Sequence, residues 1–386
     1  MRRLPGFLVF PLVVACATGR GVVPAVNGQP STVSGQPASD DTTWYVTNRA
    51  RQGVGFSRTA ADSLEFGFVV SRHREHNLLQ PHFLEAVNSE PIDTVRLSRQ
   101  EFSVRLRARD SVAASTGDGT IMYVHGYAVS FGHAIKQASD IQHRGSHHGL
   151  MVAFSWPANA SLMNSAIVSR AYWEDRATAT KSHGAFREAV DVIRRAVRPG
   201  AFTIVGHSLG SELMSEGLAA PSSLRDTLIV SPLGAIVLFA ADLGISRFRD
   251  SLAAPLKAVA SRRIVYSSDD DMLMGLSRRM HREQRVGQAT AARTLTSLGV
   301  EVVDVTLGMR ARHGLRRIYE PGHAMRNASA ALYDFFGVVR GVTADCRAAA
   351  GMATRDEDGS WRLSDAPLPA GVPAMPTDPA NCTGAK

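Results

Sequence analysis

A serine between two glycines raises the chemical question of this sequence. Gly206-His207-Ser208-Leu209-Gly210 follows the apolar run Phe202–Val205 and precedes a helix-like pattern. A strand that turns sharply into a helix exposes a serine hydroxyl as a nucleophile, and glycines two residues away on each side leave room for the neighbouring chain. The alternative is a small residue in an ordinary tight turn. The pentapeptide alone leaves both interpretations open.

A nucleophilic serine also needs hydrogen-bond donors for the negative charge that develops on the substrate carbonyl oxygen. The apolar run "TIMYV" ends in His125-Gly126-Tyr127-Ala128, where the glycine permits a sharp turn that aims successive N–H groups at one point. We therefore predict the backbone N–H of Tyr127 or Ala128 as one oxyanion donor. The N–H of Leu209, at the positive end of the following helix, is predicted as the second donor.

Candidates for the acid and the base follow later strands. The run "RRIVYSS" is followed by Asp269, Asp270 and Asp271, which also suit a solvated loop and a helix cap, so these residues alone leave the acid open. His323 stands just before an amphipathic helix and is favoured as the base. Its rival His313 lies among arginines, which would lower its pKa. The order serine, aspartate, histidine is that of α/β-hydrolases.

These residues require a scaffold that brings strand ends together. From residue 119 onward, short apolar runs alternate with helical patterns, which predicts a mostly parallel sheet with helices on both faces. Functional residues in such sheets follow the carboxyl ends of the strands. Before residue 119, stretches such as Phe66–Val70 and Phe102–Leu106 predict antiparallel strands. The helices are expected at 128–142, 176–197, 209–219, 271–281, 288–298 and 324–340.

Neighbouring residues receive structural roles. On a sharp turn His207 points away from the serine beside it, so we assign it to packing. Trp156, at the end of "LMVAFSW", is expected in the wall or the core. The loop 143–148 contains three histidines, but His147 and His148 are poorly spaced for joint chelation. We therefore expect no metal at this loop.

Composition limits the classes of partner. With 44% hydrophobic and 20% charged residues the chain is typical of a globular protein. The net charge of +8 comes almost entirely from arginine, since only four lysines are present. A basic surplus suits nucleic acid or an anionic polymer, but these arginines are scattered and no recognition motif accompanies them, so no nucleic-acid partner is expected.

The first residues are typical of an export signal. Two arginines precede the apolar run Leu4–Ala15, which is too short to span a bilayer. Val13-Val14-Ala15-Cys16 resembles the lipobox of bacterial lipoproteins. We expect a signal peptide at 1–15, a lipid anchor on Cys16, and a flexible tether at 16–42. Because Ala17, not aspartate, follows the cysteine, resemblance to sorting rules favours the outer membrane, with the protein facing the periplasm.

The remaining cysteines fit an oxidising compartment. Cys346 and Cys382 form an even pair once Cys16 carries lipid, and we expect a disulfide between them, with two free thiols as the alternative. The bond would tie a C-terminal extension at 342–386 back to the preceding domain.

Several motifs resemble the bacterial α/β-hydrolases known as domain of unknown function 900. The similarity runs from about Trp44 to Gly341. It rests on "VTNR", "VHGY", "FSWP", "GHSLG", "AADLGISRF", "YSSDDDMLMGLS", "RVG" and "GHAMRNASAALYDFF". The resemblance implies an α/β-hydrolase fold, no metal, no organic cofactor and a triad of Ser208, Asp271 and His323. It favours Asp271 over Asp270, because a serine six residues later, Ser277, is expected to point back to it.

One departure from the family lies in the predicted oxyanion loop. The family often has asparagine after His-Gly-Tyr, and this chain has Ala128, which we expect to change how the loop is braced.

Together these patterns predict an α/β-hydrolase domain at 43–341 that cleaves small or lipid-like carboxylic esters through an acyl-serine, as an esterase or lipase. Two alternatives stay open. One is an acyltransferase with the same triad, and the other is an inactive lipoprotein of the same fold that binds a ligand in the cell envelope.

Overall fold

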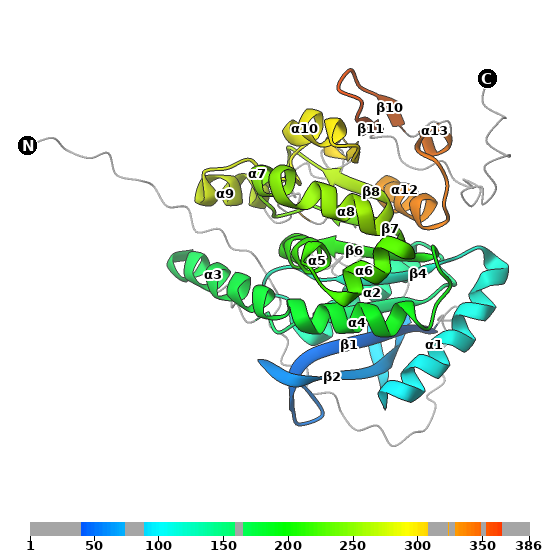
Figure 1. The fold of residues 1–386 in the computed structure, drawn as a ribbon. Helices are drawn as coiled ribbons and strands as arrows, with labels where there is room; N and C mark the ends of the chain where they lie inside the picture. The colour runs from blue at the N-terminus through cyan, green and yellow to red at the C-terminus, as the bar shows by residue number, and fades with distance from the viewer. Residues whose placement is uncertain are drawn as a thin grey trace, which may run out of the picture.

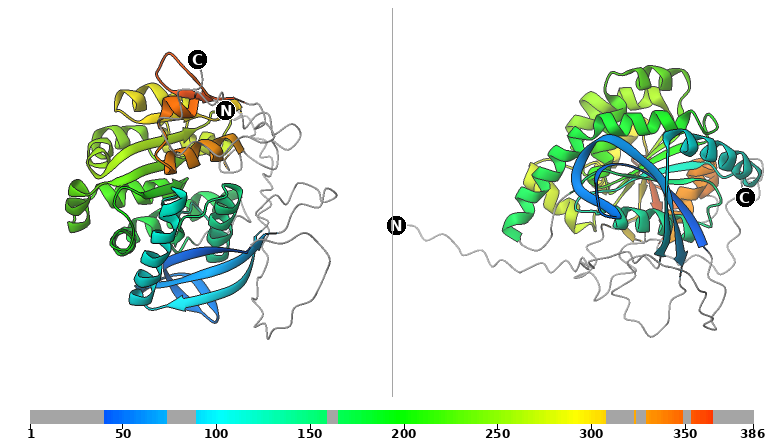
Figure 2. Two further views of the ribbon diagram at one scale, coloured as in Figure 1. Left: turned by 90° about the vertical axis from the view of Figure 1, so that its right-hand side faces the viewer. Right: turned by 90° about the horizontal axis from the view of Figure 1, so that it is seen from below.

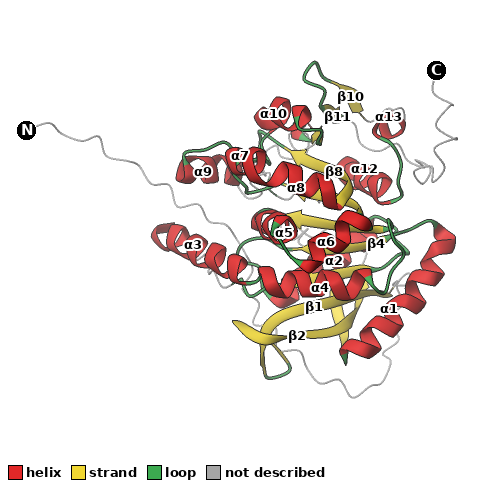
Figure 3. Ribbon diagram, in the orientation of Figure 1, coloured by secondary structure: helices red, strands yellow, loops and turns green. Residues whose placement is uncertain are grey.

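The computed structural model describes residues 40–73, 89–158, 165–307, 323, 329–348 and 353–364. Its centre is one sheet, in which 11 strands lie in the order β10-β11-β9-β8-β7-β6-β4-β5-β1-β2-β3 (Figures 1 and 3). The strands are β1 (Asp40–Gln52), β2 (Gly55–His73), β3 (Ser89–Leu97), β4 (Thr120–Val124), β5 (Met151–Ser155), β6 (Phe202–His207), β7 (Leu233–Phe239), β8 (Ala260–Ser267), β9 (Glu301–Asp304), β10 (Ala353–Arg355) and β11 (Trp361–Leu363).

Helices join most of these strands. The α-helices are α1 (Arg99–Ala113), α2 (Phe131–Arg144), α3 (Ser165–Lys181), α4 (His183–Arg194), α5 (Leu209–Ala219), α6 (Ser223–Val230), α7 (Ile245–Arg247), α8 (Ala253–Val259), α9 (Met272–His281), α10 (Ala292–Ser297), α12 (Ser329–Val339) and α13 (Ala344–Arg347). Short 3-10 turns occupy Ala114–Thr116 and Ala289–Ala291, and a π-turn occupies Phe248–Leu252. No helix in the described ranges has the length and apolarity needed to cross a membrane.

The middle of the sheet is parallel and its ends are antiparallel. β4, β5, β6, β7, β8 and β9 pair in parallel, and β1 joins them in parallel through β5. β2 and β3 extend that edge as antiparallel strands. The chain order reverses at β4, which lies between β5 and β6. Such a switch point opens a crevice at the carboxyl ends of the strands, and here the ends of β4 and β6 meet.

Alternating side chains of the strands feed two cores, one on each face of the sheet. Met122 and Ile204 belong to the core that α1, α4, α5 and α8 cover. Their neighbours Tyr123 and Val205 belong to the core under α2 and α12. Figure 2 shows the sheet between these layers of helices. The prediction of a mostly parallel sheet with helices on both faces is therefore confirmed.

The predicted strand at Phe102–Leu106 is wrong, because these residues lie in α1. Ser98 and Glu101 form a reciprocal capping box that starts the helix. Phe102 and Leu106 are both fully buried and stand four residues apart, so they share one helix face. The spacing of four residues fits a helix. The five residues 102–106 taken alone also fit the alternation of apolar and polar side chains that is typical of a strand.

Other boundaries differ from expectation. The helix expected at 176–197 is two helices, α3 and α4, separated at Ser182, whose hydroxyl donates to the carbonyl of Thr178 and accepts from the Asn48 amide. β1 begins at Asp40, so residues 40–42, expected at the end of the tether, belong to the sheet. Within the expected C-terminal extension, β11 adds to the sheet in parallel beside β9.

Candidate active site

Ser208 occupies a sharp turn between β6 and α5. Its φ of 54° and ψ of −124° lie outside the regions that most residues adopt. Three backbone hydrogen bonds hold this conformation. The N–H of Ser208 donates to the carbonyl of Phe239 at 2.9 Å, and its own carbonyl accepts from Ser211 at 2.9 Å and from Asp242 at 3.3 Å. Such over-determined strain is typical of a functional position.

The glycines beside Ser208 are required by close approach of the backbone. A Cβ at Gly206 would lie 2.7 Å from the Cα of Ser211. A Cβ at Gly210 would lie 2.4 Å from the carbonyl oxygens of Val124 and His125. These separations are far inside van der Waals contact, so the turn needs glycine at both positions.

The loop after β4 lies directly against Ser208. A Cβ on Gly126 would come within 2.9 Å of the Ser208 Cβ. Ala128 has a φ of 58°, and its N–H already donates to Asp175 Oδ2 at 3.0 Å. This bond argues against Ala128 as an oxyanion donor and gives it a bracing role. Tyr127 and Leu209 therefore stay as the candidate donors.

Arg49 braces this loop, and sequence reasoning missed it. Its guanidinium donates to the Val129 carbonyl at 2.7 Å and to Ser155 Oγ at 2.9 Å, and so joins the β4 and β5 exits. The side chain is among the largest fully buried ones of the described residues, and burial lowers its pKa to about 9. The motif "VTNR" contained the arginine, but no sequence signal linked it to a loop 80 residues away.

His125 is buried as a neutral ring between this arginine and Trp156. Its Nδ1 lies 2.9 Å from the Gly126 carbonyl and its Nε2 lies 3.4 Å from an Arg49 nitrogen. Because arginine only donates, Nε2 accepts and Nδ1 carries the proton. Burial and then the Arg49 charge lower the pKa of His125 to about 3. Trp156 is fully buried, as expected for a core residue. Its ring stacks on His125, and its Nε1–H donates to the His125 carbonyl at 2.8 Å.

Asp271 and His323 meet although 52 residues separate them. His323 Nδ1 lies 2.8 Å from Asp271 Oδ2, and the carboxylate side chain is fully buried. The other oxygen, Oδ1, accepts from the N–H groups of Leu273 and Met274, both at 3.0 Å, so Asp271 is also the N-cap of α9. Both carboxylate oxygens are thus fixed.

The other two aspartates of the run make different contacts. The Asp269 carboxylate accepts from the N–H of Thr290, while the N–H of Asp270 donates to Ser268 Oγ. Among the three, Asp271 is the one whose carboxylate holds the His323 imidazole.

His207 positions His323 instead of only filling space. Its Nε2 lies 3.1 Å from the His323 carbonyl, and the two rings lie 4.8 Å apart. A carbonyl only accepts, so Nε2 of His207 carries a proton. Since His207 directly precedes Ser208, this contact brings the His323 backbone to the strand that carries the serine.

The expectation that Ser277 points to Asp271 is wrong. Ser277 Oγ donates to Asp242 Oδ1 at 2.5 Å. Asp242 follows β7, and its own N–H donates to the carbonyl of Ser208. Ser277 stands six residues after Asp271, and this spacing determines on which face of α9 Ser277 lies. It does not determine whether the carboxylate of Asp242 or that of Asp271 lies opposite that face.

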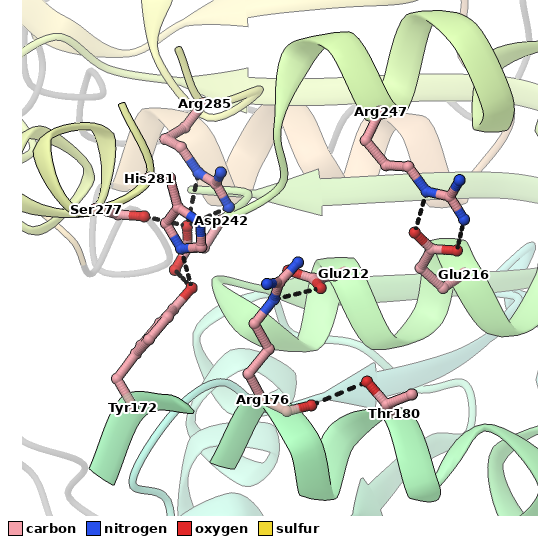
Figure 4. Close-up of polar contacts among 10 residues, drawn as sticks. All are labelled: Tyr172, Arg176, Thr180, Glu212, Glu216, Asp242, Arg247, Ser277, His281 and Arg285. Carbon is pink, nitrogen blue, oxygen red and sulfur yellow. Dashed lines mark hydrogen bonds and ion pairs between the residues drawn. The ribbon is translucent and has the colours of Figure 1, made fainter. Parts of the chain in front are cut away.

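Asp242 is the centre of a buried polar cluster beside the serine turn (Figure 4). Arg285 Nε donates to Oδ1 and the Tyr172 hydroxyl donates to Oδ2, both at 2.8 Å. His281 Nε2 lies 3.0 Å from the Tyr172 oxygen. Burial acts to raise the pKa of Asp242, but Arg285, Ser277 and Tyr172 lower it below its ordinary value. The Asp242 carboxylate is ionised, and the positive charge of Arg285 balances it. Its bonds hold α3, the end of β7 and α9 together.

Helix α5, which begins directly after Ser208, is tied to its neighbours by two further ion pairs (Figure 4). Arg176 of α3 lies 2.8 Å from Glu212, and Arg247 of α7 lies 2.7 Å from Glu216. The helix therefore holds its place relative to both flanking elements.

Several predicted residues lie outside the described part of the chain. These are Cys16 with the signal peptide, the rival base His313, and Cys382. Cys346 is described and is disulfide-bonded, while the identity of its partner stays a prediction.

Comparison with known proteins gives weak similarity to individual proteins and a clear family match. No curated protein matches. Among solved structures, a fungal esterase from Rhizomucor miehei is 12% identical, with 78% of this chain and 85% of that chain covered and a TM-score of 0.35. An esterase/lipase from an uncultured bacterium is 12% identical over 80% of this chain and 95% of that chain, with a TM-score of 0.30. An esterase from Pyrobaculum calidifontis is 12% identical over 63% and 93%, with a TM-score of 0.29.

The family model covers more than half of the chain. It matches residues 100–316, the part that contains the switch-point loops, the Ser208 turn and Asp271. The chain belongs to the alpha/beta hydrolase family of unknown function, DUF900.

Proposed function

We propose that this protein is a serine hydrolase that cleaves carboxylic esters through an acyl-serine intermediate. The observation that carries the proposal is the 2.8 Å contact between Asp271 and His323, which His207 joins to the strained Ser208 turn. A buried acid that holds an imidazole beside the residue preceding a strained serine has no evident structural need, whereas nucleophilic catalysis requires these three groups.

In this mechanism His323 Nδ1 stays bonded to Asp271, which leaves Nε2 as the nitrogen that serves the serine. Nε2 takes the proton of Ser208 Oγ as the oxygen attacks the ester carbonyl. The carbonyl π electrons move to oxygen, and the N–H groups of Tyr127 and Leu209 stabilise that charge. The tetrahedral intermediate then collapses, the ester C–O bond breaks, and Nε2 returns the proton to the leaving alcohol. Water repeats the sequence on the acyl-serine and releases the acid.

Exposed apolar side chains near this site support a lipid-like or acyl-chain substrate. Met272 and Leu276 on α9 are 45% and 42% exposed, and α9 begins directly after Asp271. Trp173 on α3 is 43% exposed, and its ring lies 4.8 Å from that of His281 at the end of α9. An exposed apolar rim suits binding of an acyl chain.

A fluorophosphonate probe tests the nucleophile directly. We expect the wild-type protein to be labelled on the peptide that contains Ser208, as read by mass spectrometry, and the Ser208→Ala variant to lose the label. The exposed Ser246 provides a matched control, and Ser246→Ala should label like the wild type. Labelling that persists in Ser208→Ala rejects the assignment. Product analysis with added alcohols separates hydrolysis from acyl transfer.

The proposal places the enzyme on the membrane through a lipid at Cys16, in the cell envelope facing the periplasm. Metabolic labelling with a fatty-acid analogue tests this in the wild type and in Cys16→Ser. A mature protein that retains its N-terminal methionine contradicts export.

A further inference from the structure

One face of helix α3 carries three polar side chains that contact the surroundings of the candidate active site. Tyr172, Asp175 and Arg176 are separated by three and by four residues, so they lie on the same side of the helix. Each of them contacts a different element. Two of these contacts reach the serine turn and α5, and the third reaches the loop 125–130 after β4, which we call the oxyanion loop.

The contacts to the serine turn come from the two ends of this face. The Tyr172 hydroxyl donates to Asp242 Oδ2 at 2.8 Å, and the N–H of Asp242 donates to the Ser208 carbonyl at 3.3 Å. Arg176 lies 2.8 Å from Glu212, which belongs to the first turn of α5, directly after Ser208. Figure 4 shows both side chains leaving the same helix toward these two carboxylates.

The contact to the oxyanion loop comes from Asp175. Its Oδ2 accepts from the N–H of Ala128 at 3.0 Å, and the residue is fully buried. Ala128 has a φ of 58°, which alanine adopts only under constraint. Tyr127 and Ala128 share a planar peptide bond, so a fixed N–H on Ala128 also fixes the carbonyl end of Tyr127. This limits how the N–H of Tyr127, the candidate oxyanion donor, can turn.

Arg49 holds the next residue of the same loop with the opposite charge. Its guanidinium donates to the Val129 carbonyl at 2.7 Å, and the residue is 1% exposed. The charge of Asp175 acts to raise the pKa of Arg49, against the larger effect of burial. A buried carboxylate and a buried guanidinium therefore hold successive residues of the oxyanion loop, and each lowers the cost of burying the other.

We propose that Asp175 is a positioning residue for the hydrolase reaction, because it fixes the oxyanion loop relative to α3. Tyr172 and Arg176, on the same helix face, fix the serine turn and α5. The helix thereby sets the distance between the nucleophile and the oxyanion donor. The inference rests on the proposed function. Oxyanion donors act on an oxygen position that is reached only in the transition state, so a displaced loop lowers kcat more than it changes KM.

Two substitutions of Asp175 separate positioning from simple folding. Asp175→Leu removes the acceptor for the Ala128 N–H and keeps a branched side chain in the same place. Asp175→Asn retains an amide oxygen that accepts the same hydrogen bond. Glu174→Leu is the matched control, because Glu174 is the neighbouring carboxylate on the same helix and its side chain is 55% exposed.

The assay is hydrolysis of a p-nitrophenyl ester, with kcat calculated per folded chain from thermal unfolding of the same samples. In Asp175→Leu we expect kcat to fall by about 10²-fold, with KM within about threefold of the wild type. Asp175→Asn should retain kcat within about tenfold, and Glu174→Leu should match the wild type. A residue that serves folding alone would lower the amount of folded protein and leave kcat per folded chain unchanged.

A second pair of variants covers the case in which Asp175→Leu does not fold. The Arg176 side chain is 38% exposed, so Arg176→Gln breaks the ion pair to α5 without leaving a cavity. We expect kcat to fall by about three- to tenfold, because α5 then shifts relative to the oxyanion loop. Arg170→Gln is the control. It breaks the Arg170–Glu174 ion pair within α3 and should leave kcat unchanged.

The possible failures of this inference differ from a failure of the proposed function. Wild-type kcat in Asp175→Leu, equal losses in Asp175→Leu and Asp175→Asn, or equal losses in Arg176→Gln and Arg170→Gln would each overturn the inference and leave the proposed function intact. A wild type that neither hydrolyses esters nor takes up the fluorophosphonate label at Ser208 rejects the proposed function, and this inference with it.

Discussion

Asp271→Asn separates the two tasks that this residue performs in the structure. Oδ1 caps α9 by accepting from two N–H groups, and Oδ2 holds His323 at 2.8 Å. Asparagine caps helices about as well as aspartate, so an amide oxygen in place of Oδ1 keeps the cap. We expect the free energy of unfolding to change by less than about 1 kcal/mol.

The same substitution should nearly abolish activity. The amide nitrogen faces Nδ1 of His323 and donates to it, which selects the tautomer with its proton on Nε2. That tautomer cannot accept the proton of Ser208. We expect kcat/KM to fall by about 10³–10⁴-fold, or about 4–5.5 kcal/mol of transition-state stabilisation.

The assay is hydrolysis of a p-nitrophenyl ester, with urea unfolding of the same samples. Asp270→Asn is the control, since Asp270 is equally buried in the same turn. It should retain activity within about tenfold of the wild type, because its carboxylate does not hold the base. An equal loss in both variants, or a larger loss in Asp270→Asn, refutes the assignment of Asp271.

Three further predictions concern the scaffold. Because burial and Arg49 lower the pKa of His125 from 6.5 to about 3, its contribution to stability is full above pH 6.5 and is lost as pH falls toward 3. In urea unfolding, the free energy of unfolding should fall by up to about 1.4 kcal/mol per pH unit below pH 6.5, and this dependence on pH should be weaker in His125→Gln. Equal slopes in the wild type and the variant would contradict a neutral buried ring. Gly210→Ala places a Cβ 2.4 Å from the Val124 carbonyl oxygen, so we expect destabilisation by about 3 kcal/mol or more, and a stable, active variant would show that the turn relaxes. Ala128→Asn should stabilise the fold by about 0.5–1 kcal/mol, because asparagine tolerates the φ of 58° better than alanine; unchanged or lower stability in urea would count against strain at this position.

Local patterns predicted the sheet well because each strand or helix carries its own signal. The run that became β6 has buried side chains throughout, and glycine, serine and glycine at its end describe the turn that follows. For α1 the spacing of Phe102 and Leu106 fits either a strand or a helix, and the capping box of Ser98 and Glu101 is the local signal that favours the helix.

Contacts between distant segments could not be predicted in the same way. Arg49 supports a loop 80 residues away, and Ser277 bonds Asp242 instead of Asp271. The carboxylate of Asp41 in β1 contacts the imidazoles of His73 in β2 and His143 in α2, and the sequence drew attention only to His143. Residue type states what a side chain can bond, but the partner depends on which surfaces pack together.

The sequence by itself determined the class of fold and the sharp turn at Ser208, because these follow from hydrophobic periodicity and from the backbone needs of glycine, and it also gave the order of the candidate serine, acid and base along the chain. Only the tertiary structure decided which aspartate meets His323 and which N–H groups near Ser208 are already engaged. Side-chain pairing across the sheet depends on strand order, and strand order is settled by burying both faces of the sheet at once.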